Sequence, residues 1–229
     1  MKSERIPVKS FSADNGFIGK MQKLVREEVL PYQYNILNDA IPGIEKSHAI
    51  ENIRLAAEKL RGKDVKPDEF YGMVFQDSDV AKWIEAAAYA LAAGEDPELE
   101  KAVDETIQLY GASQHEDGYV DSYFTVKCPD KMWTNICDAH ELYCAGHMME
   151  AAVAYYEVTG KRELLDIMSK SADCIYEQFM KKNTRAYPGH PEVELALMRL
   201  WRATGNEKYK ELAKHFVDVR GQAPNYFVE

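Results

Sequence analysis

The sequence lacks the segments that would place it in a membrane or in a secretory route. No run approaches the roughly 20 consecutive apolar residues that a membrane span requires. The first residues, MKSERIPVKSFSADNGF, lack the continuous apolar stretch of a secretory signal. We therefore expect a cytoplasmic protein with no membrane partner.

The sequence also lacks a concentration of positive charge and a set of paired cysteines. Its formal net charge is −10, and the basic residues are scattered, so nothing in it would attract a phosphate backbone. Four cysteines are too few for a disulfide scaffold in 229 residues. Nucleic acid is excluded as an expected partner, and the thiols are expected to be reduced.

Several enzyme signatures are missing as well. The chain contains no glycine-rich phosphate loop, no GxSxG nucleophile elbow and no HExxH metal motif. Nucleotide-binding enzymes, α/β-hydrolases and zincin-type proteases are therefore excluded.

What the sequence does contain is helical periodicity, without strand-like alternation of useful length. Apolar residues recur at helical spacing over residues 15–37, where Pro31 interrupts the pattern, and again over residues 46–60. An internal repeat follows, formed by EAAAYALAAG, EAAVAYYEVTG and ELALMRLWRATG, which open at Glu85, Glu150 and Glu194. Each copy ends at a glycine and is followed by a second amphipathic segment, so each predicts a helix, a glycine C-cap and a second helix.

The two helices of each pair differ in their hydrophobic pattern. The first is apolar nearly all round and the second is charged along one face, which places the first inside and the second outside. We predict a single all-α domain over residues 1–229, in which αα-hairpins form part of an (α/α)6 toroid. About four of the six hairpins are present, so we expect an exposed apolar edge at the C-terminal end, which a homodimer could cover.

Polar residues gather just before the predicted inner helices, where the loops of a toroid line one mouth. Three of these lead-ins are Phe75–Asp79, Asn135–Glu141 and Tyr187–Glu192. Asp77 has an ordinary explanation as a helix cap, and Pro191 as a first-turn proline, but neither explains the adjacent His190. Carboxylates, amides, histidines and aromatic rings at one mouth indicate a polar small-molecule pocket suited to a sugar.

Two alternatives to a sugar site are open from the residues alone. Cys137, His140, Cys144 and His147 have a spacing that could bind zinc, although ligands spread over two turns do not converge easily on one tetrahedral ion. The DGY sequence at residues 117–119 could be a β-turn with a packed aromatic ring rather than part of a pocket.

Six blocks of the sequence together resemble glycoside hydrolase family 127, from about Pro31 to the C-terminus. They are FQDSD, KWIEAAAYALA, QHEDGY, HELYCAGHMMEAAVAYYEVTGK, PGHPEVELALMRLWRATGNEKY and DVRGQAPNYF. The resemblance implies an α/α barrel that hydrolyses β-L-arabinofuranosyl linkages with retention, using a cysteine nucleophile at a zinc site and a glutamate acid/base. It makes His140 and His190 sugar-contacting residues, and it places Gln76, Asp77 and Tyr119 in matching blocks.

The resemblance also implies that the catalytic groups are absent from this chain. The zinc-ligating cysteines and the essential glutamate of the family fall downstream of Glu229, so no catalytic residue and no metal or other cofactor is assigned here. We expect a glycosidase-like protein that contributes the sugar-binding half of a barrel, binds a small sugar or oligosaccharide, and is inactive alone. The alternative is a non-catalytic carbohydrate-binding or dimeric assembly module built on the same repeats.

Overall fold

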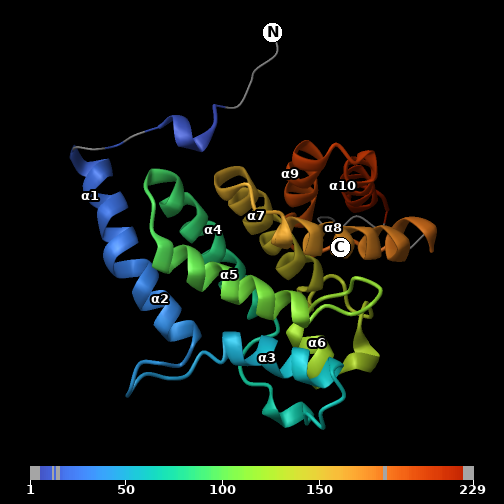
Figure 1. The fold of residues 1–229 in the computed structure, drawn as a ribbon. Coiled ribbons are helices and arrows are strands. Elements are labelled where there is room, and N and C mark those ends of the chain that lie inside the picture. The colour runs from blue at the N-terminus through green and yellow to red at the C-terminus, as the bar shows by residue number, and fades with distance from the viewer. Residues whose placement is uncertain (1–5, 12, 14–15, 183–184, 224–229) are drawn as a thin grey trace.

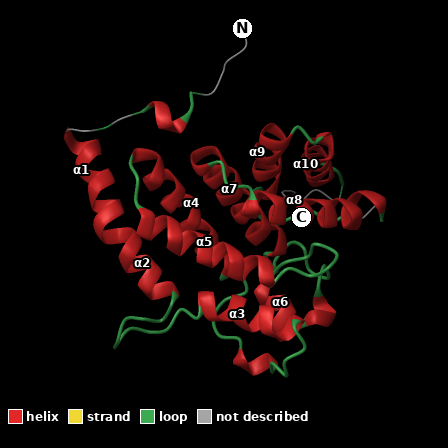
Figure 2. Ribbon diagram, in the orientation of Figure 1, coloured by secondary structure: helices red, strands yellow, loops and turns green. Residues whose placement is uncertain are grey.

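The computed structural model describes residues 6–11, 13, 16–182 and 185–223, and within that part it is helical, with no strand (Figure 2). The all-α prediction is confirmed. No helix in this part is long and apolar enough to cross a membrane.

The helix predicted over residues 15–37 forms, but a π-helical turn interrupts it before Pro31. Helix α1 (Gly16–Leu24) continues through a π-helical turn (Val25–Val29) into α2 (Leu30–Leu37). Pro31 is the second residue of α2, two positions after the π turn ends, and a proline in the first turn of a helix needs no N–H there. The helix therefore continues past Pro31, which does not end it. The partner helix α3 spans Ala49–Leu60 and starts three residues later than expected.

The three predicted hairpins are all present. They are α4 (Asp77–Ala93) with α5 (Pro97–Ala112), α7 (Glu141–Thr159) with α8 (Glu163–Tyr176), and α9 (Val193–Thr204) with α10 (Glu207–Arg220). Gly160 and Gly205 cap their helices with φ angles of +79° and +74°, which is the left-handed conformation that glycine adopts most easily. Gly94 ends α4 in an extended conformation instead.

The hairpins are arranged in two layers (Figure 1). In the inner layer α2 packs against α4, α4 against α7, and α7 against α9; in the outer layer α3, α5, α8 and α10 follow one another in the same order. Helix α7 buries 14 of its 19 residues, whereas the outer helix α10 buries five of 14. The predicted inner and outer positions are thus confirmed, and the chain forms part of an α/α barrel.

Short elements fill the space between the hairpins. These are η1 (Val8–Ser10), η3 (Pro67–Glu69), α6 (Ser122–Lys127), η4 (Pro129–Lys131) and a π-helical turn after α8 (Glu177–Lys181). Helix α6 packs against α3 and closes a small second core that contains Phe70 and Val126. The main core lies between the two layers and holds Tyr110, Met148, Met149, Tyr155 and Phe179.

The exposed apolar surface lies mainly at the other end of the arc from the one predicted. Phe17 and Ile18 on α1 are 75% and 64% exposed, and Met21, Leu24 and Val25 continue the same stretch. Leu195 and Val217, nearer the C-terminus, are 56% and 59% exposed. The prediction of a C-terminal apolar edge therefore underestimated α1, which contacts the π turn that follows it and lines a groove together with residues of α4.

Candidate sugar site

The N-terminal ends of the inner helices meet at one mouth of the arc. His140 is the residue before α7, Glu192 is the residue before α9, and Phe75 lies two residues before α4. Residues from three separate lead-in loops therefore reach the same region, as the toroid prediction required.

The structure brings His140 and His190 together. Their ring centroids are 5.1 Å apart, and the two Nε2 atoms are 3.2 Å apart. Nδ1 of His140 lies 2.6 Å from the carbonyl oxygen of Asp138. Because a carbonyl oxygen only accepts, this contact places the hydrogen of a neutral His140 on Nδ1, so its Nε2 is an acceptor and His190 Nε2–H is the donor. The pair thus presents one acceptor and one donor side by side.

A glycine allows the two histidine loops to approach. The N–H of Gly189 donates to the carbonyl oxygen of Cys137 at 3.1 Å, and a Cβ atom at position 189 would lie 2.2 Å from that oxygen. His140 itself has a φ of +62°, a left-handed conformation that is unfavourable for a residue with a Cβ. Gly189 therefore permits the close approach of the two loops, and His140 adopts a left-handed backbone conformation where it brings its ring next to that of His190.

Tyr143 lies at the centre of the aromatic cluster. Its ring centroid is 5.6 Å from that of His140, 5.0 Å from that of His190 and 4.5 Å from that of His147. Lys82 Nζ on α4 donates to the Tyr143 hydroxyl at 3.0 Å and lies over its ring. Tyr143 and Lys82 thus connect the histidine pair to α4.

A group of ionisable side chains lies deeper along the inner face. His147 Nδ1 is 3.4 Å from Glu192 Oε1, and Glu192 also interacts with Glu150. Arg199 Nη1 donates to Glu150 and to Glu85, at 2.8 Å each. A Cβ at Gly146 would lie 3.1 Å from the backbone of Val193, so this glycine lets the start of α9 approach α7.

Burial shifts the pKa values of Glu192 and His147 in this group. Burial and then the neighbouring Glu150 carboxyl raise the pKa of Glu192 to about 8. Burial and the positive charge of Lys82 lower the pKa of His147. At neutral pH the Glu192 carboxyl is therefore mostly protonated and His147 is mostly neutral.

Gln76 and Asp77 have structural partners within the chain. Gln76 Nε2 donates to the carbonyl oxygen of Ser47 at 2.8 Å, and its Oε1 accepts from the Met73 N–H at 2.8 Å. Asp77 is buried and accepts from the N–H of Ser122 at 2.8 Å and from the Ser122 hydroxyl. These contacts hold the lead-in to α4, and the predicted contact of either side chain with a sugar remains a prediction.

Tyr119 is buried behind the α7 lead-in. Its hydroxyl donates to Glu141 Oε1 at 2.7 Å, and Glu141 also accepts from the N–H of Trp133 at 3.0 Å. Burial raises the pKa of Glu141 to about 7, although these hydrogen bonds oppose the shift. The β-turn considered for DGY forms over residues 115–118, where the Gly118 N–H donates to the carbonyl oxygen of His115 at 3.0 Å. Gly118 has a φ of +99°. A sugar contact for Tyr119 likewise remains a prediction.

The cysteines of the zinc hypothesis do not converge with the histidines. In the described part, the one group whose potential ligand atoms all lie within 4.8 Å of one another is His147, Glu150 and Glu192. It contains no thiol, and burial raises the pKa of Cys144 well above its usual value. These residues do not fit the cysteine-ligated zinc that the family resemblance implies, so we derive no step through a metal.

Several members of the site were not identified from the sequence. Tyr143, Lys82 and Arg199 lie within helices rather than in the lead-in loops. The glutamate that opens each copy of the repeat was the sequence signal for these ion pairs. Glu85 and Glu150 both bind Arg199, and Glu194 binds Arg220 at 2.8 Å.

Known proteins resemble this chain along nearly all of its length. A non-reducing end beta-L-arabinofuranosidase of Bifidobacterium longum subsp. longum is 41% identical over 223 residues, which cover 89% of this chain and 33% of the relative. The crystal structure of a GH127 beta-L-arabinofuranosidase from Geobacillus stearothermophilus T6 is 52% identical with a TM-score of 0.84, covering 93% of this chain and 33% of that one. A second solved GH127 beta-arabinofuranosidase is 32% identical with a TM-score of 0.83, covering 94% and 34% of the two chains.

The chain spans about a third of the length of these relatives. The family model described as the beta-L-arabinofuranosidase GH127 catalytic domain matches residues 12–227. With the barrel segment, the paired histidines and this match in agreement, the chain belongs to glycoside hydrolase family 127.

Proposed function

We propose that this chain forms the sugar-binding wall of a β-L-arabinofuranosidase active site. The observation that carries the proposal is the His140–His190 pair, two imidazoles from loops 50 residues apart whose Nε2 atoms lie 3.2 Å apart at the mouth of the barrel segment. Two relatives, 41% and 52% identical to this chain, are β-L-arabinofuranosidases, which supports the choice of sugar.

The chemistry of the pair suits a sugar with adjacent hydroxyl groups. A hydroxyl both donates and accepts, so one can donate to His140 Nε2 while another accepts from His190 Nε2–H. The rings of Phe75 and Tyr143 flank the histidines and offer apolar surface to the C–H groups of the sugar. The contact between the histidines would then be exchanged for contacts to the ligand.

We further propose that this chain binds the sugar without cleaving its glycosidic bond. Retaining hydrolysis needs a nucleophile and an acid/base on either side of the anomeric carbon. Protonated Glu192 is the most acid-like carboxyl near the mouth, but it is held between His147 and Glu150 and no nucleophile has been assigned opposite it. The groups that break the bond are expected outside these 229 residues, as the family resemblance implies.

Binding of methyl β-L-arabinofuranoside, measured by saturation-transfer NMR and calorimetry, tests the proposal. We expect His140→Ala and His190→Ala each to weaken binding about tenfold, the loss of one good hydrogen bond in the site. His215→Ala, which changes a histidine on the outer helix α10, is the matched control. Absence of binding by the unaltered chain, or equal binding by all four proteins, contradicts the proposal.

Hydrolysis of an aryl β-L-arabinofuranoside tests the second part. We expect no turnover above background by the unaltered chain. Turnover that disappears in Asp77→Ala or Glu192→Gln would show instead that this chain carries its own catalytic carboxylate.

A further inference from the structure

His147, Glu150 and Glu192 form a cluster that the proposed sugar contacts do not use. One ring nitrogen of His147 and one carboxylate oxygen of each glutamate all lie within 4.8 Å of one another. His147 and Glu150 are three residues apart and share one face of α7, whereas Glu192 is the residue before α9. Their side chains are 17%, 12% and 16% exposed, so the cluster is largely shielded and joins two elements of the inner layer.

The separation of the potential ligand atoms suits a small metal ion. Zinc binds imidazole nitrogen and carboxylate oxygen at about 2.0–2.2 Å, so two ligands of a tetrahedral site lie about 3.3–3.6 Å apart. His147 Nδ1 and Glu192 Oε1 are 3.4 Å apart. One imidazole and two carboxylates are ligands that zinc accepts, and a water molecule would complete four-coordination.

Glu192 has an acceptor atom that the protein does not satisfy. Its Oε1 is buried, and no donor among the described residues makes a hydrogen bond to it. A Cβ at Gly146 would lie 2.9 Å from Cγ of Glu192, so this glycine makes room for the glutamate side chain against α7. A buried carboxylate oxygen without a partner costs free energy, which a cation bound to it would recover.

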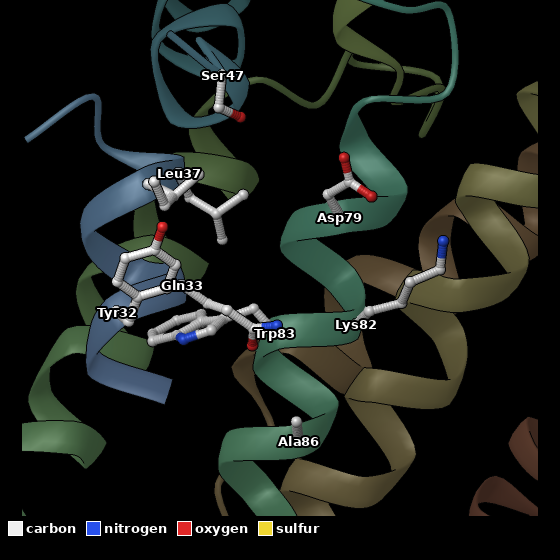
Figure 3. A pocket seen from close by; sticks show the side chains of 9 residues that line it. Tyr32, Gln33, Leu37, Ser47, Asp79, Lys82, Trp83 and Ala86 are labelled. Carbon is white, nitrogen blue, oxygen red and sulfur yellow. The ribbon is translucent and has the colours of Figure 1, made fainter. Parts of the chain in front are cut away.

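The neighbouring cations are bonded to other groups. Arg199 Nη1 donates to Glu85 and to Glu150. Figure 3 shows the Lys82 side chain extending from α4 away from α2, and its Nζ donates to two hydroxyl groups rather than to a carboxylate. Within the described residues, neither cation makes an ion pair with Glu192.

The protonation states at neutral pH are compatible with metal binding. Burial and the charge of Lys82 lower the pKa of His147, so its ring is neutral and has a lone pair to offer. Burial and the Glu150 carboxyl raise the pKa of Glu192, so binding of a metal ion releases the proton that this carboxyl holds.

From this geometry we propose that His147, Glu150 and Glu192 bind a zinc ion that fastens the start of α9 to α7. The site differs from the cysteine-ligated zinc that the family resemblance implies, because it contains no thiol and its three protein ligands all belong to this chain. Glu192 follows His190 by two residues, so the ion restricts the movement of the loop that carries this histidine. The inference goes beyond the proposed function and does not depend on sugar binding.

Equilibrium dialysis against Zn²⁺ followed by elemental analysis tests the site. We expect one zinc ion per unaltered chain, and His147→Ala and Glu192→Gln should each weaken zinc binding by more than about tenfold. Glu192→His, which supplies another zinc ligand, should retain binding. His215→Ala, on the outer helix α10, is the matched control and should bind zinc like the unaltered chain. Circular dichroism of each variant verifies that it is folded.

Co²⁺ in place of Zn²⁺ identifies the ligand atoms. We expect the visible absorption of tetrahedral Co²⁺ without the charge-transfer band that a thiolate ligand produces. The proposal is overturned by a thiolate band, by the absence of stoichiometric zinc, or by zinc binding that His140→Ala abolishes and His147→Ala leaves intact. Binding of methyl β-L-arabinofuranoside is measured separately in metal-free buffer, so either proposal can fail without the other.

Discussion

At the scale of single residues, the close packing of Gly189 against Cys137 determines where His190 lies. Substitution by alanine would place a Cβ 2.2 Å from the Cys137 carbonyl oxygen, so the loop must move away. We predict that Gly189→Ala weakens binding of methyl β-L-arabinofuranoside about tenfold, since sites of this kind depend on placement to within about 0.5 Å. Calorimetric titration measures the effect.

The matched control for this substitution is Gly221→Ala. A Cβ there would be 3.6 Å from the backbone oxygen of Asp218, which is an ordinary contact distance. Unchanged binding in Gly189→Ala would mean that the His190 loop does not depend on this approach.

The raised pKa values of Glu192 and Glu141 predict how the free energy of unfolding changes with pH. The pKa of Glu192 is raised to about 8 and that of Glu141 to about 7, so between pH 5 and pH 8 the folded protein holds protons that the unfolded chain has released. The free energy of unfolding should therefore fall as pH rises across this window. Glu192→Gln, which keeps a neutral side chain at every pH, should make this decline shallower.

Urea unfolding at pH 5 and pH 8 measures the decline. Glu98→Gln, on the exposed first turn of α5, is the control for loss of a carboxylate. An equal decline in the Glu192→Gln variant and the unaltered protein would assign the pH dependence to other groups.

The sequence identified the loop residues of the site better than its helical ones. His190 could be found because proline and glutamate beside it had ordinary roles and the histidine did not. Tyr143 and Lys82 could not be found, since their importance depends on how α4 and α7 are rotated about their axes, which the packing of the inner layer decides. Asp77 and Tyr119 are hydrogen-bonded within the protein, to Ser122 and to Glu141, and their predicted contact with a sugar stays a prediction.

At the scale of elements, Arg199 links three inner helices. From α9 it donates to Glu85 on α4 and to Glu150 on α7, and its side chain is only 17% exposed. We predict that Arg199→Met lowers the free energy of unfolding by about 2 kcal/mol, somewhat less than the 3–5 kcal/mol for a fully buried pair because water reaches these groups.

Chemical denaturation followed by circular dichroism tests this prediction. Arg202→Met, an exposed change on the same helix, controls for the loss of an arginine from α9. Equal destabilisation by both substitutions would indicate that the ion pairs contribute nothing specific.

The helices and their pairing could be predicted because the repeat carries its own boundaries. A glycine ends the inner helix of each of the three repeats, and a change from all-round to one-sided hydrophobicity separates the layers, as α7 and α10 illustrate. The π turn before Pro31 could not be predicted, since its winding follows from packing as well as from the proline. Helix α6 was missed because six residues are too few to establish a periodicity.

At the scale of the whole molecule, α1 exposes a run of large apolar side chains within the part of the chain that the structure describes. Phe17, Ile18 and Met21 are exposed and, together with α4, line a groove of about 690 Å³. We predict that the isolated chain self-associates through α1 as a homodimer, and that Phe17→Ser combined with Met21→Ser shifts it to a monomer.

Sedimentation velocity over a range of concentrations measures this association. The paired substitution Leu195→Ser and Val217→Ser, which removes exposed apolar residues elsewhere, is the control. A chain that remains monomeric at all concentrations would contradict association through α1.

The arginine that links the inner helices also has a consequence for how the chain folds. Repeat proteins whose units contact only their neighbours can gain or lose one unit at a time. Arg199 instead bonds to the first and second hairpins of the repeat from the third, so its contacts exist only after all three have docked. Amide hydrogens in α4, α7 and α9 should therefore become accessible to exchange in a single concerted opening, and the arc should behave as one cooperative unit despite its modular sequence.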